Sequence, residues 1–498
     1  MTTIGKFLTK HNLILPAVSL VAVILIATAV VDLEEMARGA IFNAWPCQLQ
    51  WISQWTPKDW FVATSDSTVL GFESAVVVLI GSILLAVLMN RAININLFSL
   101  QGMYRMRLMR AFLGASNTFR RENPFTHFDP KDTPHETDLP SAPGAPLHVI
   151  NTTLNLVGTT NPAWMQRKAE SFTFSPIHAG SWRLGYVPAR LYGGGKGVTV
   201  ATAMAISGAA FNPNMGYQSS PLLSMLMTFF NLRLGYWLPN PKRPTSGKWL
   251  ATQNENFFSK SGPSFALFPL VEELLGKTDD TTRWIELTDG GHFENLGLYE
   301  MVLRRVRRII VVDAGADPRF QFEDLGNAVR KIQIDLGVPI EFACEPDAIE
   351  TGDMKMVKGM NLKNRYCVVG RIRYHCVDSV PQGTDVDQFD GYLVYIKASL
   401  TGREPVDVIQ YAKTHLTFPH ESTANQFFNE PQFESYRKLG SFILETIEGQ
   451  AEIRARQTMI QYHLNVAAAI QAGQTVPKEP VTSPYEAFLA GARAQWSR

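Results

Sequence analysis

The pattern of hydrophobic and polar positions is clearest between Trp284 and Pro318, where it predicts a strand, a tight turn, a helix and a second strand. Trp284–Thr288 combines β-branched and aromatic residues, and Asp289-Gly290-Gly291 interrupts it. Apolar residues then recur at helical spacing from 295 to 305. Ile309–Val312 is wholly apolar, which is typical of a strand buried on both faces of a parallel sheet. We therefore expect Asp289 at the carboxyl end of such a strand, where α/β sheets place ligands and catalytic groups.

Hydrophobic periodicity predicts further elements on both sides of this stretch. The predicted strands are 147–156, 171–174, 366–374 and 392–400. The predicted helices are 198–208, 222–234, 323–336, 435–453 and 457–470, with Gly337 as the stop of the third. Strands that alternate with helices predict an α/β fold.

Two stretches near the N-terminus are long and apolar enough to cross a bilayer. Leu13–Val31 contains no charged residue, and the stretch 67–89 is interrupted only by Glu73. A signal peptide is the alternative for the first stretch, but it shows no clear small-residue cleavage site. Lysines precede the first stretch and arginines follow the second, which by the positive-inside rule puts both ends in the cytoplasm. We expect residues 1–95 to form a transmembrane hairpin in the inner membrane, with spans at 13–31 and 67–89 and the main domain cytoplasmic.

Residues 96–146 are expected to join this hairpin to the main domain. Asn96–Leu113 mixes Leu, Met and Phe with arginines, so it either lies on anionic headgroups or packs on the main domain. Asn123–Pro146 is rich in proline and predicts either a linker or an extended loop along the surface. The main domain is expected at 147–445, and a helical extension at 446–498.

Composition narrows the classes of partner and cofactor. The chain has 498 residues, a net charge of +1 and 18% charged residues, which argues against a nucleic-acid-binding surface. Its four cysteines include no CxxC pair, so the sequence predicts neither a disulfide framework nor a zinc site. We expect no metal and no other cofactor.

Ser207, in the segment AISGAA, is the serine to consider as a nucleophile. A nucleophile elbow needs glycine two residues before and two residues after the serine, because its turn is sharp, but alanine stands at both places here. The glycine-rich loop 193–197 could supply oxyanion N–H groups, but it lies too close in sequence for a crossover and a second strand. We therefore favour a buried helix serine as the interpretation of Ser207, and a plain loop as the interpretation of residues 193–197.

Asp289 is the stronger catalytic candidate, as a base for a serine in a two-residue site. A metal site that combines it with His292, Glu294 and Asp313 is less favoured, since these offsets need not face one way. His292 and Glu294 are expected to stabilise the turn by hydrogen bonds. His420 could serve as a base, but a lone loop histidine is more often structural.

Several segments, taken in order, resemble the bacterial patatin-like phospholipases of the cytosolic-phospholipase type. They include TDGGHFENLGLYEMV, VVDAGADP, AMAISGAAFNPNMGYQSSP and the long segment that contains TFPHESTANQFFNEPQFESYRKLG. The resemblance covers about Asn94–Gly440. It implies a patatin-like mixed or parallel sheet flanked by helices, and a Ser–Asp dyad that cleaves lipid acyl esters, with Asp289 as its base.

The resemblance is to the C-terminal half of that family, whose G-x-S-x-G motif lies upstream of the spans, and AISGAA matches a region without the nucleophile. It implies a membrane-anchored lipid acyl hydrolase with Asp289 as base. The nucleophile is then either Ser207 or a serine of a partner polypeptide with the G-x-S-x-G half. The alternative is a non-catalytic membrane subunit or scaffold. We expect a phospholipid or other acyl-lipid substrate, and association with such a partner or with itself.

Overall fold

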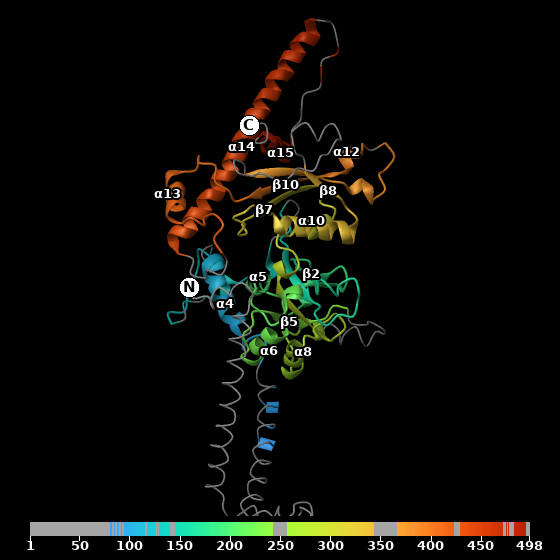
Figure 1. Cartoon of the computed structure of the whole chain (residues 1–498), viewed down its shortest axis with the longest axis vertical. Coiled ribbons are helices and arrows are strands. Elements are labelled where there is room, and N and C mark those ends of the chain that lie inside the picture. Colours follow the sequence, from blue (N-terminus) through green and yellow to red (C-terminus); the bar gives the residue numbers. More distant parts are fainter. Residues whose placement is uncertain are drawn as a thin grey trace, which may run out of the picture. The chain divides into compact units, whose positions relative to one another are not determined.

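A computed structural model describes residues 94–471 and 483–494, apart from 115–116, 126, 128, 140–144, 243–255, 343–365, 384 and 423–428. It also describes positions 475 and 477 and six positions between 80 and 91. The chain divides into two compact units, Met1–Phe293 and Glu294–Arg498. We describe each unit by itself (Figure 1).

The first unit contains a six-stranded sheet in the order β4-β3-β2-β1-β6-β5. Its strands are β1 (Ile150–Asn155), β2 (Ala169–Phe174), β3 (His178–Ser181), β4 (Gly185–Pro188), β5 (Tyr236–Pro239) and β6 (Trp284–Asp289). Every neighbouring pair of these strands is antiparallel, and Thr152 of β1 lies opposite Asp289 of β6. Asp289 is therefore the last residue of an internal antiparallel strand.

Helices and short helical turns surround this sheet. They are α4 (Leu100–Leu108), η1 (Met109–Leu113), η3 (Pro130–Asp132), η4 (Glu136–Asp138), η5 (Ala189–Leu191), α5 (Val200–Ser207), η6 (Gly216–Gln218), α6 (Pro221–Phe229), α8 (Leu267–Leu274) and η7 (Gly290–His292). The small, apolar residues of α5 let it pack closely on β1 and β6. Its Ala203 and Ile206 join Phe172, Phe174 and Tyr192 in the main apolar core of this unit.

A buried ion pair joins three segments of the first unit. Arg233 Nη1 lies 2.8 Å from Glu273 Oε1 on α8, and Arg233 Nη2 donates to the carbonyl oxygen of Ile95 at 2.9 Å. The indole Nε1 of Trp237 also donates to Glu273, at 2.6 Å. Both charged side chains are almost fully excluded from solvent, so the charge of each is compensated by the charge of the other.

A second buried carboxyl, that of Glu286, connects β6 to the segment that follows α5. Its Oε1 accepts a hydrogen bond from Asn212 Nδ2 at 2.6 Å, and its Oε2 accepts one from Asn214 Nδ2 at 3.2 Å. The backbone that leads away from Ser207 is thereby fixed to the strand that ends at Asp289.

The second unit contains a four-stranded mixed sheet in the order β7-β10-β9-β8. The strands are β7 (Arg308–Asp313), β8 (Ile340–Phe342), β9 (Cys367–Ile372) and β10 (Gly391–Lys397). Only β7 and β10 are parallel within it, with Asp313 opposite Lys397. The helices are α9 (Leu298–Leu303), α10 (Glu323–Leu336), η8 (Tyr374–Cys376), α12 (Val386–Phe389), α13 (Val406–Thr414), α14 (Glu430–Gln471) and α15 (Pro484–Ala494).

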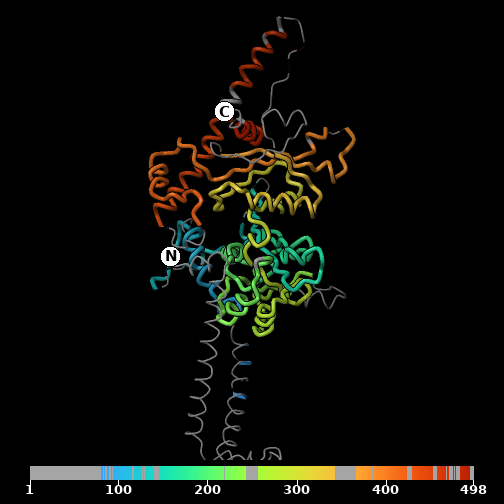
Figure 2. The backbone as a smooth tube through the Cα atoms, in the orientation of Figure 1, coloured from blue at the N-terminus to red at the C-terminus, as the bar shows by residue number. Residues whose placement is uncertain are grey.

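Two helix layers cover this sheet, as the tube view also shows (Figure 2). Helices α13, α14 and α15 pack over Val369, Val394 and Ile396 on one face. Helix α10, with its buried Leu325 and Ile332, lies against the other face (Figure 1). The strand β7 is at an edge of the sheet.

The predicted patatin-like sheet is wrong. Strand β6 pairs antiparallel with both of its neighbours, so Asp289 does not end a strand of a parallel sheet. The prediction of Ile309–Val312 as a strand is confirmed, and β7 does pair in parallel, but Ile310 and Val312 are 45% and 67% exposed. Because β7 is an edge strand covered on one face only, its apolar run did not indicate burial on both faces.

The transmembrane hairpin and the multi-pass inner-membrane location expected for residues 1–95 are contradicted. Within the described part of the chain, no helix combines the length and the apolar character that crossing a membrane requires. The predicted spans themselves, 13–31 and most of 67–89, lie outside the described residues.

Most of the individual elements predicted from periodicity are confirmed. The helix 323–336 coincides with α10, and Gly337 ends it with a φ of +68°. The segments predicted as two helices, 435–453 and 457–470, form the single helix α14. The basic segment 96–113 is helical from Leu100 onward.

We predict that Arg233→Met lowers the free energy of unfolding by about 3–5 kcal/mol, because Glu273 would remain buried without its cation. Chemical denaturation followed by circular dichroism measures the change. The exposed Arg190→Met is the control and should shift stability by less than about 0.5 kcal/mol. Equal effects of the two substitutions would contradict the importance of the ion pair.

Candidate active site around Asp289

Asp289 ends β6 and begins the turn η7. Its Oδ1 accepts a hydrogen bond from the backbone N–H of Gly291 at 2.6 Å, and its own N–H donates to the carbonyl oxygen of Ala209 at 3.4 Å. Glycine at position 290 permits this turn, since a Cβ atom there would lie 3.1 Å from the carbonyl oxygen of Asn151. The carboxyl group is thus held at one end of the β1–β6 pair.

The environment of Asp289 favours its neutral form more than water does. Burial raises the pKa of its carboxyl group, and the hydrogen bond from Gly291 opposes the shift only in part. No cationic side chain pairs with it among the described residues. A partly buried carboxyl group with a raised pKa is suited to accept and return a proton.

Ser207 lies near Asp289 but is not bonded to it. Its Oγ donates to the carbonyl oxygen of Asn151 at 2.7 Å, and the next residue, Thr152, is opposite Asp289 in the sheet. Ser207 is also the last residue of α5, where the helix dipole is negative and disfavours a developing anion. The structure therefore brings the two candidates to the same end of β1 without forming a dyad.

Tyr104 is a neighbour of Asp289 that the sequence did not indicate. Burial, followed by the negative charge of Asp289, raises the pKa of its phenol, so the phenol stays protonated at neutral pH. A Cβ atom at Gly208 would lie 2.5 Å from the Tyr104 hydroxyl oxygen, so only glycine lets this ring approach. In sequence Tyr104 is one aromatic residue in a basic helix, and no motif marks it.

His292 stabilises the turn, as predicted. Its Nδ1 lies 2.9 Å from Thr288 Oγ1, and its ring is buried. Burial lowers the pKa of His292 to about 4, against the effect of a hydrogen bond at the backbone of Ala210. The imidazole is therefore neutral at pH 7 and does not provide Asp289 with a cation.

The other residues of the metal hypothesis have partners of their own in the second unit. Glu294 accepts hydrogen bonds from the N–H groups of Leu296 and Tyr299 at the start of α9, which confirms its predicted structural role. Asp313 pairs with Lys397 Nζ at 2.9 Å. Of the residues that the structure describes, no group of three or more His, Cys, Asp and Glu could hold a metal ion.

His420, the other histidine considered as a base, is also buried in the second unit. Its Nδ1 accepts a hydrogen bond from the N–H of Asp317 at 3.3 Å. Burial, and then the nearby ammonium of Lys397, lower its pKa. The structure shows His420 as a hydrogen-bonded core histidine of the second unit.

Two N–H groups of the glycine-rich loop are already used in backbone hydrogen bonds. The N–H of Gly193 donates to the carbonyl oxygen of Phe258 at 2.8 Å, and that of Gly197 donates to Gly194 at 3.2 Å. Gly197 has a φ of +87°, and a Cβ there would lie 2.4 Å from the carbonyl oxygen of Ala189. These contacts support the interpretation of residues 193–197 as a structural loop.

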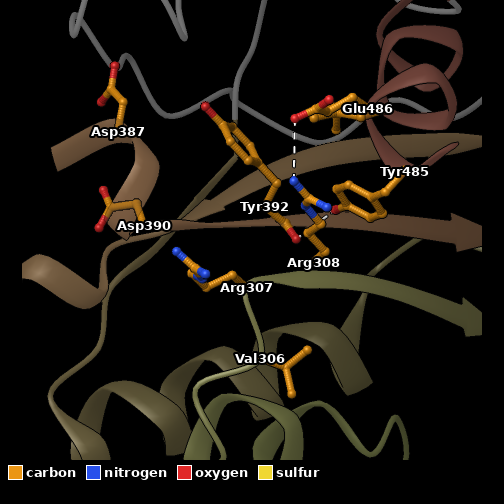
Figure 3. A pocket seen from close by; sticks show the side chains of 9 residues that line it. Val306, Arg307, Arg308, Asp387, Asp390, Tyr392, Tyr485 and Glu486 are labelled. Carbon is orange, nitrogen blue, oxygen red and sulfur yellow. Dashed lines mark hydrogen bonds and ion pairs between the residues drawn. The ribbon is translucent and has the colours of Figure 1, made fainter. Parts of the chain in front are cut away.

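The second unit also contains a pocket of about 790 Å³, at the start of β7 and β10 (Figure 3). Tyr392, Tyr485 and Leu489 contribute apolar surface to it. Its carboxylates face cations that compensate them, since Glu486 lies 3.4 Å from Arg308, and Asp387 pairs with Arg371. It includes no serine, cysteine or histidine among the described residues that line it, so we do not assign the chemistry to it.

Comparison with known proteins does not assign the chain to a family. No protein-family model matches the chain, and no curated protein is significantly similar to it.

We predict that His292 makes the stability of the first unit depend on pH between about 4 and 6.5. In that range the unfolded chain binds a proton at this residue and the folded chain does not, so the contribution of His292 to the free energy of unfolding rises with pH. The contribution is roughly 3 kcal/mol across the range, at about 1.4 kcal/mol per unit of pKa.

Urea denaturation at several pH values measures this dependence for the wild type and for His292→Asn. The difference between the two should grow as the pH rises to 6.5, whereas the exposed His178→Asn should leave the wild-type profile unchanged. Parallel profiles for the wild type and His292→Asn would show that His292 is not buried in its neutral form.

Proposed function

We propose that this chain takes part in the hydrolysis of lipid acyl esters, with Asp289 as the general base and a serine of a second polypeptide as the nucleophile. In the first step the serine oxygen attacks the acyl carbonyl while its proton passes to Asp289. The ester bond breaks, and the alcohol leaves with that proton. Water then releases the fatty acid by the same route in reverse, which restores the carboxylate.

The observation that supports this role is the state of the Asp289 carboxyl group. It is half-buried, its pKa is raised, and within the described residues it has no ion-pair partner. A carboxylate that only stabilised the fold would normally be compensated by a cation or by several donors. Its one short hydrogen bond, from Gly291, orients the group and leaves Oδ2 available to a reacting hydroxyl.

Two features favour a nucleophile from another polypeptide over Ser207. The Ser207 proton is already donated to the carbonyl oxygen of Asn151. The position of Ser207 at the C-terminal end of α5 offers carbonyl groups where a hydrolase needs N–H donors for an oxyanion. The resemblance to patatin-like phospholipases, in which an upstream G-x-S-x-G segment supplies the serine, agrees with this proposal.

The test is ester hydrolysis by the full chain, alone and co-expressed with products of neighbouring reading frames that contain G-x-S-x-G. We expect hydrolysis of short-chain and phospholipid esters in the co-expressed complex. Asp289→Asn keeps the shape of the side chain but removes the base, and should lower kcat about 10²–10⁴-fold. Ser207→Ala should leave kcat within about twofold of the wild type.

The matched control is Asp279→Asn, which changes a carboxylate that caps a surface turn through Thr281 and Thr282. It should leave kcat unchanged. Full activity of Asp289→Asn would remove Asp289 from the mechanism. An inactive chain and an inactive complex would favour the non-catalytic subunit, and loss of activity in Ser207→Ala would assign the nucleophile to this chain.

A further inference from the structure

Helix α8 presents its apolar side chains to solvent, which is the reverse of an ordinary surface helix. Its exposed positions include Leu267, Phe268, Val271 and Leu274, and Phe268 is 69% exposed. The spacing of three and four residues puts Leu267, Val271 and Leu274 along one side of the helix. A surface helix normally turns such a stripe toward the core and its charged residues toward water. In α8 the buried residues are Pro269 and the charged Glu273.

Helix α6 contributes a second exposed apolar stripe next to the first. Met225 and Phe229 lie one turn apart on α6, and Phe229 is 61% exposed. The two helices are in contact and lie side by side (Figure 1). We call these side chains the α6–α8 apolar surface, which comprises Met225, Phe229, Leu267, Phe268, Val271 and Leu274.

The fold holds this surface outward. Leu270, on the inner side of α8, packs against Ile95, Trp237 and Ala266. The Arg233–Glu273 ion pair fixes the rotation of α8 about its axis, because turning the helix would bring Glu273 out of its pairing. The exposed leucines and phenylalanines therefore cannot turn inward at small cost, and folding alone does not explain them.

We propose that the α6–α8 apolar surface rests on a lipid surface with anionic headgroups, with the two helices lying in its plane. The six side chains contain no hydrogen-bonding group. They also lack tyrosine, tryptophan and arginine, which are enriched at the centre of protein interfaces together with phenylalanine and methionine. Leucine and phenylalanine stripes flanked by lysine are typical of helices that lie at a membrane interface.

The charges around α8 agree with this occupant. Lys260 precedes the helix and Lys277 follows it, and both are exposed. Of the acidic residues on α8, Glu273 is neutralised by Arg233. Burial, with smaller effects of Asp279 and Glu273, raises the pKa of Glu272 to about 7, so this carboxyl group loses its charge readily near neutral pH. Apart from Asp279, in the turn that follows the helix, little negative charge opposes the approach to an anionic surface.

A hydrogen bond from a side chain to the backbone extends the surface toward the residue Phe98, which precedes α4. The side-chain amide of Asn231, two residues after Phe229, donates to the carbonyl oxygen of Phe98, and Phe98 is 67% exposed.

The proposal does not rest on the hydrolase function, because lipid binding requires neither Asp289 nor a nucleophile. A failure of one proposal therefore leaves the other intact.

Co-sedimentation of the full chain with vesicles of phosphatidylcholine and phosphatidylglycerol tests the proposal. We expect the wild type to bind, and the double variant Phe268→Ser, Val271→Ser to bind about tenfold or more weakly, since two apolar side chains no longer leave water. The double variant Lys260→Gln, Lys277→Gln should weaken binding to these vesicles and not to pure phosphatidylcholine. Hydrogen exchange of residues 262–277 should slow when vesicles are added.

The matched control changes two apolar residues of the second unit that are more exposed than Phe268 and Val271, in the double variant Val406→Ser, Leu416→Ser, which should bind as the wild type does. Three results would overturn the proposal. They are a wild type that does not bind, equal binding by the Phe268→Ser, Val271→Ser variant and the wild type, and a loss of self-association in that variant without loss of vesicle binding. The last result would assign the surface to a second copy of the chain.

Discussion

The buried ion pair between Arg233 and Glu273 determines how helix α8 is placed in the first unit. It joins the backbone at Ile95, the strand region around Trp237 and helix α8, which are distant in sequence. Two charges removed from water stabilise a fold only when their pairing is complete, so the pair specifies one orientation of α8 and disfavours the others. In that orientation the apolar stripe of α8 faces outward.

The interior of the same unit also determines the geometry near Asp289. Glu286 lies three residues before Asp289 on β6, and its hydrogen bonds to Asn212 and Asn214 hold the chain that follows Ser207. Thr153 Oγ1 donates to the carbonyl oxygen of Gly290 at 3.1 Å, which fixes the turn after Asp289. The candidate base is thus supported on both sides by side chains that take no part in the proposed chemistry, as a preorganised site requires.

Local sequence patterns predicted most elements but not how the strands pair. Periodicity identified β6, α9, β7 and α10 because each depends on residues close in sequence. The direction of pairing depends on distant segments: β1 and β5 lie on either side of β6 and run against it, and an apolar run such as Ile309–Val312 does not specify its neighbours. The parallel sheet expected from the resemblance was therefore wrong, although β7 and β10 are parallel.

The candidate site likewise combines a residue that its sequence neighbours indicate with residues that only the fold brings near it. The D-G-G turn indicated Asp289 because a carboxylate followed by two glycines is a local signal. Tyr104 reaches Asp289 from a helix about 180 residues earlier, and it fits there only because residue 208 is glycine. The hydrogen bond from Ser207 to Asn151 likewise depends on how α5 packs on β1.

The buried carboxyl of Glu286 and the buried imidazole of His292 have opposite consequences for acid tolerance. Burial, with the nearby charge of Glu273, raises the pKa of Glu286 well above its ordinary value, so the folded state retains a proton there that the unfolded chain releases above about pH 4.5. This group favours folding in acid, and its contribution is lost as the pH rises toward the folded pKa. His292 favours folding as the pH rises from about 4 to 6.5. In mildly acidic solution the two proton exchanges offset each other, so the first unit can have a flat overall pH profile that conceals two strongly perturbed groups.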